Sequence, residues 1–420
     1  MSPITLKRVQ YSTEVVASQV NPEDLGDAEV VHYSIPALQE TGRPAIGPAS
    51  EIASNKWRLQ GGEVLISKLN VHKNCTAIVE RHSDLPLLSS TEFVPFVPKG
   101  IEARYLKYVF QSQETIQHLR SFSESATRSH SRVNPNDIIK LKIHQPSLGM
   151  QTLVADYLDR ETARINGLIA EKEHILALLE EKRAALISRV VTRGLDPDAA
   201  LKPSDQEWLG EIPVHWKIQP VKYLAIVGNG STPSVENTNY WDDKGYPWLN
   251  SSVVNVSPVK NASRFVTKTA LRECHLPKIQ PPAVLIGITG QGKTRGMASV
   301  LGIEATINQH VAFIKPRTEK LDTDYLCYLL GHAYGFLRSE SDGAGSTKGA
   351  ITCEQLANMK IPVPPRDEQI GICTQIRHSL DVLEPLRLEI QCSLDLLTER
   401  RVALITSAVI GQIPEEELGG

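Results

Sequence analysis

The sequence lacks the features of membrane, secreted and metal-binding proteins. None of its apolar runs approaches the roughly 20 residues of a membrane-spanning helix, and its first residues, "MSPITLKRVQ", lack the apolar core of a secretion signal. The 6 cysteines include no C-x-x-C pair and the 12 histidines include no H-E-x-x-H spacing, which argues against a metal site. We therefore expect a cytoplasmic protein with reduced thiols, no bound metal and no membrane partner.

Aromatic residues and an excess of one charge are also missing. Aromatic side chains make up 5% of the chain, and the 5 tryptophans are expected in the core or at its rim rather than as base-stacking platforms. The formal net charge of −3 argues against a protein that coats nucleic acid without specificity. The sequence contains no N-P-P-[YF] adenine-methyltransferase motif and no Ser/His/Asp constellation, so neither of these chemistries is predicted.

What the sequence does contain is an internal repeat. "YLKYVF" at 105–110 matches "YLCYLL" at 325–330, an offset of 220, and "LKIHQP" at 141–146 matches "MKIPVP" at 359–364, an offset of 218. In each copy, short runs rich in Val, Ile and Thr lie between turn residues and predict strands. A short helix, an extended segment and a long helix follow. This period indicates two copies of a domain with a helical appendage.

The long helices carry apolar residues every seven positions, which is typical of a coiled coil. Pro385 lies inside the second stripe and is expected to kink the helix or to leave one carbonyl without its helical hydrogen bond. A helix of about 40 residues is roughly 60 Å long, and an antiparallel pair would make a spacer with a reader at each end, which suits duplex DNA. Packing of each helix on its own domain is the alternative. The predicted helix-packing residues are Leu158, Ile165, Leu179, Leu186, Ile376, Leu383, Ile390, Leu397 and Leu404.

One segment raises a different hypothesis. "GITGQGKT" at 287–294 fits the G-x-x-x-x-G-K-[ST] spacing of a nucleotide-binding loop. Such a loop needs a helix that begins at the Lys–Thr pair, but Gly296 and Gly302 would interrupt a helix there, and the following residues favour strand. The equivalent segment of the first copy has no such glycines. We therefore favour a β-hairpin tip with Lys293 and Arg295 pointing outward, and keep an NTPase with a coiled-coil arm, or a protein-binding scaffold, as alternatives.

Four phrases in residues 153–225, "YLDRET", "LLEEKRAALIS", "VTRGLDP" and "WLGEIPVHW", resemble the central conserved region of the specificity subunit of type I restriction-modification systems. Residues 54–70 and 290–316 resemble signatures of that family's target recognition domains. The resemblance implies an α+β fold with two repeated, mainly-β target recognition domains. The two long helices join them as an antiparallel coiled coil, with pseudo-two-fold symmetry. The implied domains are 1–150 and 204–365 for recognition, with conserved helical regions at 151–203 and 366–420.

The resemblance also implies a function. Such a subunit is not a catalyst, and each recognition domain reads one half of a bipartite, asymmetric site in double-stranded DNA. The helices set the spacing and dock two modification subunits, which bind S-adenosylmethionine and methylate adenine. Motor-nuclease restriction subunits, which use ATP and Mg²⁺, complete the complex. No cofactor is expected in this chain.

Basic, amide and hydroxyl side chains in the predicted loops and near strand ends are the candidates for DNA contact, because such groups hold phosphates or read base edges. A solvated turn or loop is the alternative for the loop residues. For the Asn308–Gln309 pair, bonding at strand ends is an equal alternative. The predicted DNA-binding residues are Lys56, Lys68, Asn70, Lys73, Asn74, Arg128, Arg132, Gln291, Lys293, Thr294, Arg295, Asn308, Gln309, Ser346, Thr347 and Lys348.

Overall fold

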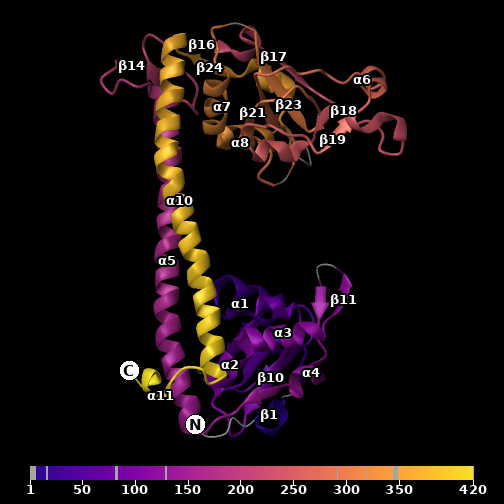
Figure 1. Ribbon diagram of the computed structural model, residues 1–420, viewed down its shortest axis with the longest axis vertical. Helices are drawn as coiled ribbons and strands as arrows, with labels where there is room; N and C mark the ends of the chain where they lie inside the picture. The colour runs from indigo at the N-terminus through magenta and orange to yellow at the C-terminus, as the bar shows by residue number, and fades with distance from the viewer. Residues whose placement is uncertain are drawn as a thin grey trace. The chain divides into compact units, whose positions relative to one another are not determined.

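The computed structural model describes residues 6–15, 18–80, 84–127, 130–290, 292–317, 319–343 and 349–419. The chain forms two compact units (Figure 1). Unit 1 contains Met1–His174 and Ile390–Gly420, and unit 2 contains Ile175–Glu389. Each unit therefore combines a β-rich part with segments of both long helices, α5 (Leu148–Arg193) and α10 (Arg366–Val409).

The β-rich part of unit 1 contains a five-stranded sheet of order β3-β6-β9-β4-β5 and a four-stranded sheet of order β2-β10-β7-β8. The helices of this part are α1 (Ile35–Thr41), α2 (Ala103–Gln111), α3 (Gln113–Ser121) and α4 (Pro135–Ile139). Its strands are β1 (Leu6–Arg8), β2 (Thr13–Val15), β3 (Gln19–Val20), β4 (Glu29–Tyr33), β5 (Ala45–Pro48), β6 (Lys56–Leu59), β7 (Val64–Ser67), β8 (Thr76–Ile78), β9 (Leu87–Ser90), β10 (Phe93–Pro98), β11 (Glu124–Thr127), β12 (His130–Arg132) and β13 (Lys142–His144).

The β-rich part of unit 2 contains the equivalent four-stranded sheet, of order β17-β23-β20-β21, and a three-stranded sheet of order β19-β18-β22. Its helices are α6 (Lys268–Glu273), α7 (Thr323–His332), α8 (Tyr334–Gly343) and α9 (Cys353–Asn358). Its strands are β14 (Leu201–Pro203), β15 (Glu211–Pro213), β16 (Lys217–Pro220), β17 (Ala225–Asn229), β18 (Trp241–Leu249), β19 (Arg264–Val266), β20 (Ala283–Gly287), β21 (Ala298–Leu301), β22 (Thr306–Ile307), β23 (Val311–Pro316) and β24 (Lys360–Val363).

One fully buried strand divides the core of each β-rich part. In unit 1, Val64 and Ile66 of β7 pack in the cluster that includes α2, and Leu65 packs in a second cluster on the other face of the sheet. In unit 2, Ile286 and Leu285 of β20 divide between two clusters in the same way. Successive side chains of a strand point to opposite faces, so a strand between two cores must be apolar throughout. This explains the apolar runs "VLI" and "AVLI".

The two long helices run antiparallel, as predicted, because each unit contains the first part of one and the last part of the other. In unit 1, Arg401 Nη1 of α10 donates a hydrogen bond to Asn166 Oδ1 of α5, 2.8 Å away. In unit 2, the hydrogen bond from Arg387 and the nearby charge of Arg183 on α5 lower the pKa of Glu384 on α10. The coiled-coil prediction is confirmed, and α10 continues through Pro385.

The heptad positions are the inward face of the helices. None of the predicted packing residues is exposed, whereas the residues that flank them along both helices mostly are. Burial of one stripe at a spacing of 3.5 residues is what a coiled-coil seam requires. Leu158, Ile165, Ile376 and Ile390 are buried, and Leu179, Leu186, Leu383, Leu397 and Leu404 are half-buried.

The boundaries predicted after residues 150 and 365 lie close to the first residues of the long helices, Leu148 and Arg366. The compact units, however, divide the chain inside these helices rather than at their ends. The four predicted ranges stay a prediction about recognition domains and conserved regions.

Candidate nucleic-acid interface

In unit 1, the loop of residues 68–75, tip loop 1, connects the antiparallel strands β7 and β8. Asn70 and Asn74 have positive φ, 51° and 48°, and lie on either side of a 3-10 turn, Val71–Lys73. Asn adopts this left-handed conformation more readily than most residues. Val71 is buried and anchors the turn, while Lys73 is exposed, and its ammonium group has no partner among the described residues. The loop therefore presents a free cation on a fixed backbone.

The two asparagines of tip loop 1 also hold it in place. Asn70 Oδ1 accepts a hydrogen bond from the main chain of Ser131 at 3.1 Å, and Asn74 Nδ2 donates one to the Gln111 carbonyl at 3.3 Å. These bonds leave the Asn70 amide nitrogen available to a ligand. Lys68, at the base of the loop, is half-buried.

Next to this loop, Arg132 of β12 forms an ion pair with Glu92, 2.6 Å away, and its side chain is 60% exposed. The other carboxylate oxygen of Glu92 is buried without a hydrogen-bond partner in the described part of the chain. Sequence reasoning missed Glu92, because only the fold brings residues 92 and 132 together. The pairing orients the guanidinium group while leaving most of it accessible.

Lys56 requires a correction. It is only 6% exposed, and its ammonium group donates hydrogen bonds to the carbonyls of Ala53 and Ser54, at 2.6 and 2.9 Å. Burial lowers the pKa of Lys56. The predicted DNA contact is therefore wrong for this side chain, because its cation already closes a loop inside unit 1.

In unit 2, residues 288–297, tip loop 2, connect the antiparallel strands β20 and β21. The described residues of this loop form turns, and the strand β21 follows directly. A helix that could hold phosphate does not begin at Lys293 and Thr294, so the nucleotide-loop hypothesis is wrong and the hairpin interpretation is confirmed. Gly287 is required at the base, because a Cβ there would overlap the carbonyl oxygen of Thr294.

The tip of this hairpin is held by α8. Tyr334 donates a hydrogen bond to the Lys293 carbonyl at 2.9 Å, and Arg338 donates one to the Gly292 carbonyl at 2.6 Å. The Lys293 side chain is exposed and Thr294 is half-buried. Two main-chain anchors thus fix the loop that carries Lys293.

Arg295 requires a second correction. It does not point outward, because it is only 4% exposed and its Nη2 forms an ion pair with Asp342 Oδ1 at 2.6 Å. Its guanidinium also lies against Gly349, where an added Cβ would overlap it. Arg295 therefore connects tip loop 2 to the segments around Asp342 and Gly349, and the predicted DNA contact is wrong for it.

Asn308 and Gln309 differ in their surroundings. Asn308 is 5% exposed, its main chain bonds Leu249, and its Oδ1 accepts from the main chain of His310 at 3.0 Å. The alternative considered for it, bonding at a strand end, is therefore the correct one, and base reading by its side chain is not. Gln309 is exposed.

Gln309 belongs to a chain of exposed polar groups. Thr232 donates a hydrogen bond to Gln309 Oε1 at 2.6 Å, Gln309 Nε2 donates to His310 Nε2 at 3.2 Å, and His310 Nδ1 donates to Thr289 Oγ1 at 2.7 Å. These hydrogen bonds use one N–H and one oxygen lone pair of the Gln309 amide. The second N–H and the second lone pair are left for a ligand. A glutamine with both groups available is the side chain that reads adenine bidentately. Sequence reasoning missed Thr232, Thr289 and His310, which come from three separate segments.

Five further predicted DNA contacts lie outside the described residues: Arg128, Gln291, Ser346, Thr347 and Lys348.

Within the described ranges, none of the helices is both long and apolar enough to cross a membrane. The same part of the chain has no group of three or more His, Cys, Asp or Glu arranged to hold a metal ion.

Comparisons with known proteins agree with the resemblance found in the sequence. Residues 213–382 match the family model of the type I restriction modification DNA specificity domain. A putative type I restriction enzyme MjaX specificity subunit of Methanocaldococcus jannaschii is 25% identical over 80% of this chain and 75% of the relative. The EcoR124I/EcoR124II specificity subunit of Escherichia coli is 24% identical over 66% of this chain and 64% of that protein.

The fold agrees as well. A chain from a solved structure on complex assembly and conformational transition of the type I R-M system superposes with a TM-score of 0.72. The alignment covers 98% of this chain and 99% of that chain at 18% identity. Residues 213–382 thus match a type I restriction modification DNA specificity domain, and most of the chain is similar to specificity subunits of type I restriction enzymes.

Proposed function

We propose that each unit reads one half of a bipartite, asymmetric site in double-stranded DNA, unit 1 through tip loop 1 and unit 2 through tip loop 2. The observation that carries this proposal is the pair of equivalent loops after β7 and β20. Each presents an exposed lysine, Lys73 or Lys293, on an anchored main chain. Exposed cations on a fixed backbone suit phosphate contacts, which set the position of a protein on DNA.

Base reading needs a second kind of group beside each lysine. In unit 2, Gln309 has its amide oriented by Thr232 and His310. In unit 1, the Asn70 amide belongs to tip loop 1 and Arg132 lies next to it. Amides suit adenine and arginine suits guanine in the major groove. The two units differ in these groups, which supports two different half-sites.

The chain would act as the non-catalytic part of a larger enzyme. Two modification subunits would dock on α5 and α10 and use S-adenosylmethionine to methylate adenine. Motor-nuclease restriction subunits would add ATP- and Mg²⁺-dependent cleavage. These cofactors would bind the partner chains, and the antiparallel helices would set the gap between the half-sites.

Mapping methylated adenines in cells that carry the chain with its modification subunits tests the proposal. We expect a split, asymmetric motif. Gln309→Ala should relax one base position in one half by about 1–3 kcal/mol of discrimination, and Lys73→Ala should weaken binding by the complex and lower its salt dependence by about one counterion.

The matched control is Lys7→Ala, which removes an exposed lysine from β1, outside tip loop 1. It should leave both the motif and the salt dependence unchanged. A continuous motif, or a change in both halves from Gln309→Ala alone, would contradict the two-reader proposal.

A further inference from the structure

Both units dock a β-rich part on the start of the following long helix with the same main-chain contacts. In unit 1, Gln151 of α5 is buried, its Oε1 accepts from the Glu102 N–H at 2.9 Å, and its Nε2 donates to the Pro146 carbonyl at 2.8 Å. In unit 2, Gln369 of α10 is equally buried and bonds the Asp322 N–H at 2.7 Å and the Pro364 carbonyl at 2.8 Å. Such main-chain contacts would form equally well if the β-rich part of one unit docked on the long helix of the other.

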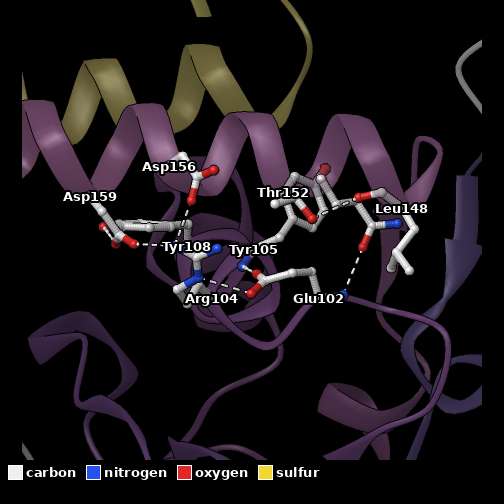
Figure 2. Close-up of polar contacts among 9 residues, drawn as sticks. Glu102, Arg104, Tyr105, Tyr108, Leu148, Thr152, Asp156 and Asp159 are labelled. Atoms are coloured by element: carbon white, nitrogen blue, oxygen red, sulfur yellow. Dashed lines mark hydrogen bonds and ion pairs between the residues drawn. The ribbon is translucent and has the colours of Figure 1, made fainter. Parts of the chain in front are cut away.

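The charges beside these contacts are reversed between the units. In unit 1, Arg104 of α2 forms ion pairs with Asp156 and Asp159 of α5, at 2.7 and 2.8 Å, and Tyr108 donates a hydrogen bond to Asp159 at 2.6 Å. Figure 2 shows Arg104 between Glu102 and the two aspartates of the long helix. In this unit the cation is on the β-rich part and the anions are on the helix.

In unit 2, the repeat offsets place Asp324 at the position of Arg104, Thr374 at that of Asp156 and Arg377 at that of Asp159. Tyr328 is at the position of Tyr108. Burial raises the pKa of Tyr328, and of the nearby charges Asp324 raises it further while Arg377 lowers it. Across the same junction, Arg366 of α10 forms an ion pair with Asp322, the residue before α7, at 2.7 Å. In this unit the anion is therefore on the β-rich part and the cation is on the helix.

A crossed pairing would bring like charges together. Arg104 would face Arg377, and Asp324 would face Asp159, while the shared glutamine contacts would still be available. Like charges in an interface are costly, whereas a single exposed ion pair adds little stability. An arrangement of this type therefore acts mainly against the wrong partner.

We propose that these reversed charges select which β-rich part docks on which long helix. The selection is independent of what the units read. It would keep each β-rich part on its own long helix. It would also oppose exchange of β-rich parts between two copies of the protein.

Single reversals in the full-length chain create the crossed combinations directly. R104D places the residue of unit 2 opposite α5, and D324R places the residue of unit 1 opposite α10. Hydrogen exchange of residues 148–162 should accelerate roughly tenfold in R104D, and that of residues 366–380 should accelerate similarly in D324R. About 1 M NaCl should reduce both effects, because the Debye length falls to ~3 Å and repulsion between charges farther apart than this is screened.

Rescue separates pairing of charges from a general loss of packing. R104D/D156T/D159R carries the residues of unit 2 at all three positions, and D324R/R377D restores opposite charge in unit 2. Both should return exchange to within about twofold of the unaltered chain, a residual of at most ~0.4 kcal/mol. The control R120D reverses an exposed charge on the neighbouring helix α3 and should have no effect.

The proposal fails if the rescue variants exchange as fast as the single reversals, or if R120D accelerates exchange as much as R104D does. Fast exchange in R104D that does not respond to salt would also overturn it. Because every readout is on the protein without DNA, failure here is distinguishable from failure of the two-reader proposal.

Discussion

The residue before the β10 and β23 strands carries different chemistry in the two units. In unit 1 this residue is Glu92, whose carboxylate forms an ion pair with Arg132. In unit 2 it is His310, which bonds Gln309 and Thr289. The strands that follow keep the same order within their sheets. The repeat therefore preserves the scaffold and varies the groups at its rim.

The docking side of each unit shows the opposite behaviour. The single O–H of Tyr105 is shared between the carbonyls of His144 and Val409, and that of Tyr325 between those of Pro362 and Val191. Each hydroxyl thus connects a strand to the end of a long helix. Contacts to main-chain carbonyls tolerate changes of the partner's side chain, so this junction can be repeated while its neighbours change.

The largest effect on stability is expected from replacing the buried glutamines, which tests whether the two docking junctions are equivalent. Gln151→Leu and Gln369→Leu each leave main-chain groups without hydrogen-bond partners where water cannot reach them. Each substitution should therefore cost about 3 kcal/mol in its own unit. Urea unfolding combined with hydrogen exchange of α2 and α7 would measure this. The exposed residues Gln117 and Gln375 provide matched Leu controls, and a loss in only one unit would show that the two junctions are not equivalent.

A smaller effect should appear on acidification. Burial, with a contribution from Lys56, lowers the pKa of His32 in β4 to about 4. The folded chain then binds fewer protons than the unfolded chain between about pH 6.5 and 4, so stability falls as the pH drops through this window. We expect a loss of about 1–2 kcal/mol at pH 5, measured as lower protection factors of β4 and β9 after correction for the intrinsic exchange rate at each pH.

The strand register identifies the residue of unit 2 that corresponds to His32. His32 pairs with Leu88 in unit 1, and in the equivalent parallel pair of unit 2 Trp248 lies opposite Thr306. Trp248 does not titrate, so exchange of β18 and β22 should show no corresponding loss from this position. His32→Gln should flatten the dependence in unit 1, and an unchanged slope in that variant would rule out His32 as its source.

The smallest expected effect comes from the tyrosines. Tyr105→Phe and Tyr325→Phe each remove a hydroxyl that bonds two carbonyls, and each should cost about 1 kcal/mol, with the two losses equal within error. Thermal unfolding would measure the loss. Tyr11→Phe and Tyr223→Phe, at residues that are each 69% exposed, are controls that should change nothing.

Local pattern by itself determined the repeat, the two long helices and the hairpin at "GITGQGKT". Heptad spacing requires one buried stripe, and glycines at 296 and 302 oppose a helix, so short-range geometry was sufficient for these predictions. The family resemblance rested on contiguous phrases and needed no contacts.

Only the tertiary structure decided which polar side chains are free. Lys56 and Arg295 have the composition of DNA contacts, but each meets its partners through the fold and is buried. Gln309 is oriented by residues from distant segments, and the reversal at Arg104 and Asp324 acquires meaning only when α2 and α7 dock on their helices. A cation or an amide has the same appearance in a sequence whether it faces solvent or a carbonyl, because burial depends on long-range contacts that a local pattern does not encode.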